Sequence, residues 1–220
     1  MTITVLSCSK NTDTFKPFYH CMEKYYPGHP KIVYFTDDGP ANPYYDTIII
    51  QHKLSEWTRG LRDFLRIIHD DKILLMIDDC FIRQPVNESR IKYAADHLSG
   101  NIALMNFEKS WDINDMPTEL SGWKMRQHGS PYEVSLMCGL WQKDKLINVL
   151  SRNCDPWTIE LEQQPCGYDY YINSGDYIID WGYRAFQKCG LVKGKWAHEC
   201  KRFLDSEGIS LDYNKRGFCD

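Results

Sequence analysis

Short apolar runs alternate with stretches of helical periodicity through the first half of the chain. The runs ITVLSC, KIVYFTDD, DTIIIQ, KILLMIDD and NIALMNF have the length and composition of buried strands. Helical periodicity is clearest from Trp57 to Ile68 and from Glu88 to Leu98. Strands that alternate with helices predict an α/β fold, in which helices flank a Rossmann-type, mostly parallel sheet on both faces.

The predicted helices carry start signals. Ser55 precedes the helix near Trp57, and Asn87 precedes the helix at Glu88, so each is predicted to cap a helix N-terminus. A further helix is predicted from about Thr12 to Tyr26.

The second half of the chain is irregular from about Met105. A strand is predicted in VSLMCGLW and a short helix in KDKLINVL, and aromatic residues, 14% of the whole chain, are concentrated toward the tail. The sequence has no internal repeat, low-complexity tract or linker. We therefore expect one domain over residues 1–220.

Charge and cysteine content narrow the class of protein. With 26 basic and 30 acidic residues the net charge is -4, so no global field attracts nucleic acid or anionic lipid. The nine cysteines include no C-x-x-C pair, which argues against a zinc site or a disulfide framework. No secretory leader and no apolar run of about 18 residues is visible. We expect a cytoplasmic protein without a transmembrane segment.

Polar residues gather where three of the predicted strands end. Ser7, Ser9 and Lys10 follow the first strand, Asp37 and Asp38 the second, and Asp78 and Asp79 the strand KILLMI. In open α/β sheets ligands bind beyond the carboxyl ends of the strands, so these residues are predicted to share one crevice.

The adjacent carboxylates of Asp78 and Asp79 present an electrostatic problem. Two like charges about 4 Å apart repel by about 4 kcal/mol at the effective dielectric near a protein surface. A hard divalent cation such as Mn²⁺ or Mg²⁺ would offset this repulsion, because it prefers oxygen ligands and bridges phosphate oxygens. The alternative is that one Asp caps the next segment and the other is solvated.

The element Ile77-Asp78-Asp79, preceded by the helix with Trp57 and followed by Pro85 and Val86, resembles the nucleotide-sugar site of glycosyltransferases with the GT-A fold. In that family an Asp-x-Asp or x-Asp-Asp element closes the nucleotide-binding half, and its last Asp typically ligates manganese or magnesium. The segments LSCSKN and TDD look like its nucleotide-contacting loops. LW followed by PWTIE resembles the acceptor-side element of small viral and bacterial capsule-type glycosyltransferases.

The resemblance implies a GT-A-like fold, with a nucleotide-sugar-binding half at 1–107 and an acceptor-side half at 108–220. It also implies roles for individual residues. Asp79 and His198 would hold the metal, and Glu160 or Asp169 would be the catalytic base. The predicted donor-binding residues are Ser7, Ser9, Lys10, Asp37, Asp38, Trp57, Arg59 and Asp78.

Several of these residues also have purely structural interpretations. Glu160 could lie in solvent on an edge strand or at a helix start, and the sequence does not choose between Glu160 and Asp169 as the base. Arg59 belongs to a basic stripe with Arg62 and Arg66, which is more typical of a solvated helix face than of phosphate binding. A lone histidine such as His198 is more often a surface or packed residue than a metal ligand.

The predicted function is metal-dependent transfer of a hexose or pentose from a nucleoside diphosphate sugar, most simply a UDP-sugar. The acceptor would be a hydroxyl of a glycan or glycoprotein glycan, in a bacterial or virus-infected host cytosol. A phage-type DNA glycosyltransferase acting on hydroxymethylated bases is an alternative, although the net charge of -4 argues against a DNA-binding groove. A metal-dependent phosphatase or nuclease is a second alternative, and a catalytically silent sugar- or nucleotide-binding module a third.

Overall fold

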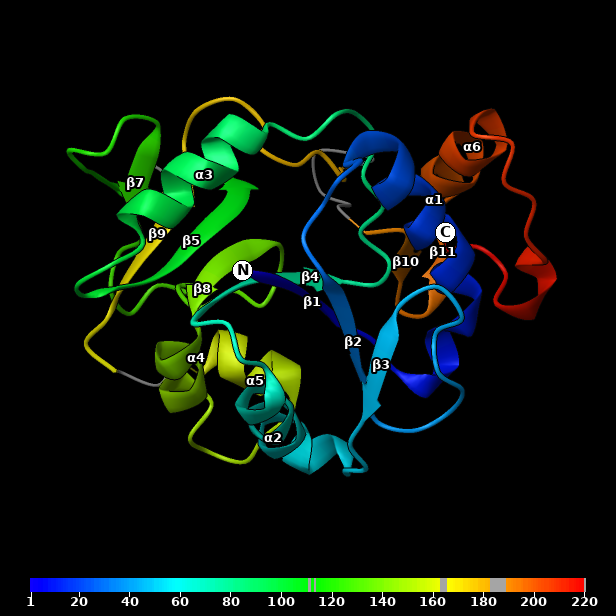
Figure 1. Ribbon diagram of the computed structural model, residues 1–220, viewed down its shortest axis with the longest axis horizontal. Coiled ribbons are helices and arrows are strands. Elements are labelled where there is room, and N and C mark those ends of the chain that lie inside the picture. The colour runs from blue at the N-terminus through cyan, green and yellow to red at the C-terminus, as the bar shows by residue number, and fades with distance from the viewer. Residues whose placement is uncertain (111, 113, 163–165, 183–188, 220) are drawn as a thin grey trace.

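The computed structural model describes residues 1–110, 112, 114–162, 166–182 and 189–219. Within them, one sheet has the strand order β3-β2-β1-β4-β8-β5-β9-β7-β6 (Figure 1). Its strands are β1 (Thr2–Leu6), β2 (Ile32–Thr36), β3 (Asp46–Ile49), β4 (Lys72–Ile77), β5 (Ile102–Lys109), β6 (Met116–Pro117), β7 (Trp123–Met125), β8 (Gly139–Gln142) and β9 (Asp169–Asn173). A separate hairpin pairs β10 (Leu191–Val192) with β11 (Lys195–Trp196).

Helices cover both faces of the large sheet, because its strands alternate apolar side chains between the two faces. In β4, Leu74 and Met76 pack into one core, while Ile73 and Leu75 pack into the other. The first core is covered by α1 (Phe15–Tyr25), α3 (Glu88–His97) and α6 (His198–Ser206), and the second by α2 (Trp57–Ile67), α4 (Lys143–Val149) and α5 (Pro156–Leu161). Figure 1 shows these two groups on opposite sides of the strands.

The predicted α/β class is confirmed, and all strands of the large sheet run in one direction except β7 and β8. Strand β8 lies antiparallel between β4 and β5, with Gly139 level with Leu75 on one side and Asn106 on the other. Residues 134–138, which precede β8, therefore lie at the carboxyl ends of β4 and β5. This insertion brings part of the irregular half to the predicted crevice.

Of the two predicted helix N-caps, one is confirmed and one is wrong. The Asn87 side chain accepts a hydrogen bond from the Arg90 N–H at the start of α3, as predicted for an N-cap. The prediction for Ser55 was wrong, because Ser55 lies inside a 3-10 helix (Leu54–Glu56) and Glu56 occupies the cap position of α2.

Two other boundaries differ from the prediction. The first predicted helix divides into a 3-10 helix (Ser9–Thr14) and α1, with Asn11 outside helical geometry. Only the end of VSLMCGLW forms a strand, β8.

A last 3-10 turn spans Tyr213–Lys215. In the part of the chain that the structure describes, every helix is too short or too polar to cross a bilayer.

Candidate active site

The carboxyl ends of β1, β2 and β4 meet in one place. The Asp78 N–H donates to the Leu6 carbonyl at 3.1 Å, and the Ser7 N–H donates to the Phe35 carbonyl at 2.9 Å. The loops after the three strands are thereby held together by backbone hydrogen bonds. The structure brings Ser7, Asp37 and the acidic pair to the same edge of the sheet, as the fold class predicts.

Asp78 is fully buried, and both of its carboxylate oxygens accept hydrogen bonds. Ser7 Oγ donates to Oδ2 at 2.5 Å, and Asn11 Nδ2 donates to Oδ1 at 3.1 Å. Burial and the neighbouring Asp79 carboxylate raise the pKa of Asp78 well above its usual range. In this conformation Asp78 orients the loop after β1, and its oxygens do not face solvent. Asn11 is the last residue of the segment LSCSKN, but it was not among the predicted site residues.

Asp79 lies beside Asp78 but is held by a different part of the chain. Its Oδ2 accepts the Leu191 N–H at 3.1 Å, and its carbonyl accepts the Gly190 N–H at 2.7 Å. Burial raises the pKa of Asp79 to about 6, while the Leu191 N–H and the Arg216 charge oppose this shift. Asp79 remains 7% exposed. Asp79 is thus buried, but less completely than Asp78, which has no exposed surface.

Gly190 permits this close approach. A Cβ at this position would lie 2.7 Å from the Phe81 ring and 3.1 Å from the Asp79 carbonyl oxygen, which is closer than side chains tolerate. The adjoining β10–β11 hairpin packs its Trp196 ring against Phe81, with ring centroids 6.3 Å apart. The C-terminal segment thus covers the end of β4.

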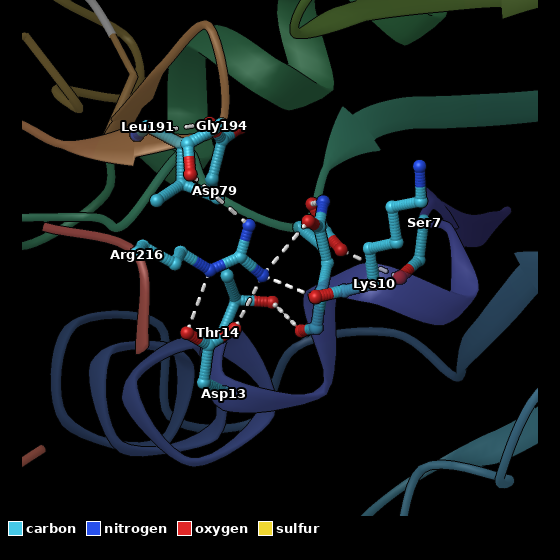
Figure 2. A network of polar contacts seen from close by, with 10 residues as sticks. Ser7, Lys10, Asp13, Thr14, Asp79, Leu191, Gly194 and Arg216 are labelled. Atoms are coloured by element: carbon cyan, nitrogen blue, oxygen red, sulfur yellow. Dashed lines mark hydrogen bonds and ion pairs between the residues drawn. The ribbon is translucent and has the colours of Figure 1, made fainter. Parts of the chain in front are cut away.

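Arg216 supplies positive charge to the acidic pair from the end of the chain (Figure 2). Its guanidinium binds both Asp13 carboxylate oxygens, at 2.7 and 2.6 Å, and donates to Asn11 Oδ1 at 3.1 Å. It also donates to the carbonyls of Lys10 and Gly194, so it joins the loop after β1 to the β10–β11 hairpin. The Arg216 side chain is only 12% exposed. The sequence KRGFCD gave no spacing signal that pointed to it.

The loop after β2 carries the predicted donor-binding residues Asp37 and Asp38. Asp37 Oδ1 accepts the N–H groups of Ser9, at 2.8 Å, and Asp38, at 2.9 Å. Burial acts to raise the pKa of Asp37, but these donors outweigh it and the pKa is lowered. Asp38 and Lys10 are exposed at the rim. Asp37 therefore fixes the loop, whereas Asp38 and Lys10 are accessible.

The helix residues assigned to donor binding are engaged within the fold. The half-buried Trp57 ring packs edge-on against Phe35, with centroids 6.2 Å apart. Arg59 forms an ion pair with Glu56 at 2.9 Å, and both side chains are exposed. This geometry favours the solvated-face interpretation of the basic stripe for Arg59.

Glu160 lies in α5, which begins after Asp155. The Asp155 side chain accepts the N–H groups of Trp157 and Thr158, so PWTIE is a capped helix rather than an edge strand. Glu160 Oε1 accepts the Leu136 N–H at 2.8 Å. Because Leu136 precedes β8, this contact brings Glu160 to the carboxyl edge of β4 and β5. Burial raises the pKa of Glu160 to about 7, with a further increase from the Glu108 charge.

Glu108, near the end of β5, is an acidic residue close to Glu160 that the sequence analysis did not identify. Its Oε2 accepts hydrogen bonds from Asn106 Nδ2 at 3.3 Å and from Ser135 Oγ at 3.4 Å. Its negative charge raises the pKa of Glu160. It also raises the pKa of the Cys189 thiol, on which a hydrogen bond with Cys80 and burial have larger effects. Glu108 thus lies between the Glu160 region and the Asp79 region. The polar NFEK end of an apolar strand was the available signal.

Asp169 is not brought to this edge. It pairs with Ile102 at the start of β5, and the register through β8 places Leu104 level with Ile73 near the start of β4. Since β4 has 6 residues at about 3.3 Å each, Asp169 lies about 20 Å along the strand direction from the acidic pair. Its carboxylate is 3.9 Å from His128 Nε2 instead. Between the two predicted bases, the geometry favours Glu160.

His198 is held by contacts with the C-terminal segment. It is exposed at the start of α6, and its ring stacks on Phe218 with centroids 4.5 Å apart. Within the described residues, the groups that come close enough to share a metal ion are Asp79, Cys80 and Cys189. His198 as a metal ligand remains a prediction from the resemblance.

Several solved structures are similar in fold. The galactosyltransferase LgtC, in complex with donor and acceptor sugar analogues, is 9% identical, with 98% of each chain covered and a TM-score of 0.50. CMP:2-keto-3-deoxy-manno-octonic acid synthetase complexed with CTP is 11% identical, with 78% of this chain and 88% of that chain covered and a TM-score of 0.50. The chain has a GT-A-like fold.

A longer protein is similar over part of its length. The bifunctional IspDF from Campylobacter jejuni is 13% identical, with a TM-score of 0.46, and the alignment covers 80% of this chain but only 50% of IspDF. This chain thus corresponds to about half of that protein. No family model and no curated protein sequence matches the chain.

Proposed function

We propose that this protein transfers a sugar from a nucleoside diphosphate sugar to a hydroxyl of a glycan. The observation that carries the proposal is the placement of two kinds of acid at one sheet edge. Asp79 lies at the end of β4, and Glu160 is held at the same edge by the Leu136 N–H. A carboxylate for a cation and a separate carboxylate for a proton are the two groups that this reaction uses.

The residues around Asp79 are compatible with Mn²⁺ or Mg²⁺. Such cations are usually held by one or two carboxylates together with substrate phosphates and water. Asp78 is buried with both oxygens engaged, so Asp79 would be the protein ligand. The raised pKa values of both residues reflect negative charge that burial leaves poorly compensated. A bound cation would stabilise the charge of the departing diphosphate.

The chain's own groups would bind and orient the donor beside Asp79. Lys10 is exposed at the rim, and the Arg216 guanidinium lies between the loop after β1 and the β10–β11 hairpin. Both bring positive charge to the region where a diphosphate would lie. Asp37 holds the Ser9 N–H and so fixes the loop that a nucleotide would contact. LgtC, which is similar in fold, was solved in complex with donor and acceptor sugar analogues, and this supports a sugar donor for the present chain.

Glu160 would act as the general base in an inverting reaction. With a pKa of about 7 it is close to half deprotonated at neutral pH, where a base combines a useful charged fraction with strength as a proton acceptor. Its Oε1 is oriented by the Leu136 N–H, which leaves Oε2 as the atom to take the acceptor hydroxyl proton. Glu108 would help to keep that carboxylate basic through its own negative charge.

The experiment is a calorimetric titration of the full chain with UDP, first with Mn²⁺ and then with EDTA, on wild type and two variants. Asp79→Asn should weaken Mn²⁺-dependent binding by about 10³-fold, since a metal contributes several kcal/mol to charge stabilisation. Asp144→Asn, exposed on α4, is the matched control and should bind as wild type does. Equal binding by the Asp79 variant and wild type would refute the metal assignment. Binding of CTP but no diphosphate would indicate nucleotidyl transfer instead.

A further inference from the structure

Two cysteines lie close to the Asp79 carboxylate of the proposed donor site. Cys80 and Cys189 are 109 positions apart in the chain, yet their Sγ atoms are 3.3 Å apart. Together with an Asp79 oxygen, all three atoms lie within 4.8 Å of one another. The proposed transfer reaction has no use for the two thiols.

The fold holds these atoms in place through contacts on both sides. Cys80 is fully buried, and the segment that carries Cys189 is fixed to Asp79 by the Gly190 N–H at 2.7 Å and the Leu191 N–H at 3.1 Å. A Cβ at Gly190 would lie 3.0 Å from Cys200 Sγ, so this segment packs without space to shift. The cluster is therefore ordered by the packing of two chain segments and not by a chance rotamer on the surface.

The donor atoms match a soft divalent cation better than a hard one. Cysteine sulfur selects Zn²⁺ and similar soft ions, whereas Mg²⁺ and Mn²⁺ take oxygen ligands. Two sulfur ligands at about 2.3 Å from a tetrahedral Zn²⁺ are about 3.8 Å apart, close to the 3.3 Å observed. Three protein ligands would leave the fourth position of a tetrahedral Zn²⁺ to a water or another ligand.

We propose that Asp79, Cys80 and Cys189 form a binding site for a soft divalent cation, Zn²⁺ or Cd²⁺. The site shares Asp79 with the hard-cation site of the proposed function. A soft ion would engage the Asp79 carboxylate together with the two sulfurs and withdraw it from the donor. Zn²⁺ would therefore compete with Mn²⁺-dependent donor binding, a consequence that rests on the proposed function.

The binding site itself is tested without nucleotide. The full chain, reduced and stripped of metal, is titrated with Cd²⁺ while the ultraviolet charge-transfer absorption of cadmium–thiolate bonds is followed. Wild type should develop this band with one equivalent. Cys189→Ser should weaken binding by at least about 100-fold, since loss of second-shell partners alone costs 10- to 100-fold. Cys166→Ser changes another half-buried cysteine and should bind as wild type does.

Asp79→Asn supplies a second variant that keeps both sulfurs. It should retain the cadmium–thiolate band but require more Cd²⁺ to reach it, because one ligand is lost. A wild-type chain without the band, or a Cys189→Ser chain that binds Cd²⁺ as tightly as wild type, would overturn the proposal. Melting curves of each variant without metal show whether the chain is folded.

The competition is measured separately. Zn²⁺ should suppress Mn²⁺-dependent UDP binding by wild type, and Cys189→Ser should bind UDP in Mn²⁺ and resist Zn²⁺. If wild type binds Cd²⁺ through Cys189 but no UDP, the soft-metal site stands and the proposed function fails. If UDP binds and the Cd²⁺ band is absent, the reverse holds.

Discussion

Two pairs of carboxylates lie at the carboxyl edge of the sheet, and the chain holds them in different ways. Asp78 and Asp79 are adjacent in sequence, and side-chain and backbone donors from two chain segments, the loop after β1 and β10, bind them. Glu108 and Glu160 come from β5 and α5, and the Glu108 charge contributes to the raised pKa of Glu160. The first pair is fixed in position by hydrogen bonds, whereas Glu160 has one backbone donor and a pKa of about 7.

The difference separates two tasks. A carboxylate that ligates a cation must be ionised and fixed, so donors around it are an advantage. A general base must gain and lose a proton near neutral pH, which requires burial with few compensating donors. The proposed reaction needs one acid of each kind. Three predictions test this division, in order of the expected size of the effect.

The largest effect is expected for Glu160→Gln. Glutamine keeps an oxygen for the Leu136 N–H but cannot accept a proton, so turnover should fall by about 10²- to 10⁴-fold. Donor binding, measured by calorimetry, should be unchanged. Glu162→Gln, two residues farther along the chain, exposed and paired with Arg152 at 3.0 Å, is the control and should keep full turnover. A Glu160 variant that loses donor binding would place this residue with the first pair instead.

The free energy of unfolding should depend on pH in a way that reveals the raised pKa of Glu160. Burial raises the pKa of Glu160 from 4.5 to about 7, so between these values the folded chain retains a proton that the unfolded chain has released. Stability from this group is present below pH 4.5 and lost as the pH rises to about 7, by up to about 3 kcal/mol. Denaturant unfolding of wild type and Glu160→Gln across this range should show a larger loss in wild type, because the raised pKa values of Asp78 and Asp79 act on both proteins. Parallel pH profiles would contradict the raised pKa.

The smallest effect is expected for Glu108→Gln. Removing this negative charge should lower the pKa of Glu160 only slightly, because burial remains the larger cause. The pH at which turnover reaches half of its maximum should move down accordingly. A midpoint that stays in place would mean that Glu108 does not act on Glu160 and that the two do not form a functional pair.

The elements that the sequence predicted well depend on neighbours in the chain. The Asn87 cap and the apolar runs of β1, β2 and β4 were right because a cap residue or a run of buried side chains decides each one locally. Ser55 failed as a cap because three residues of 3-10 helix precede α2, a tightening that capping patterns do not reveal. The pattern of PWTIE is compatible with an edge strand or a helix start, and the Asp155 cap decides for the helix.

The sequence by itself determined that acids lie at the end of β4, because an apolar run that stops at two aspartates places them beyond a buried strand. Tertiary structure alone decided which other groups join them. The antiparallel insertion of β8 brings Glu160 to this edge, and the register of β9 takes Asp169 to the opposite one. Packing of the C-terminal segment places Cys189 and Arg216 beside the acids. Such contacts depend on register and on packing between distant segments, which local patterns do not encode.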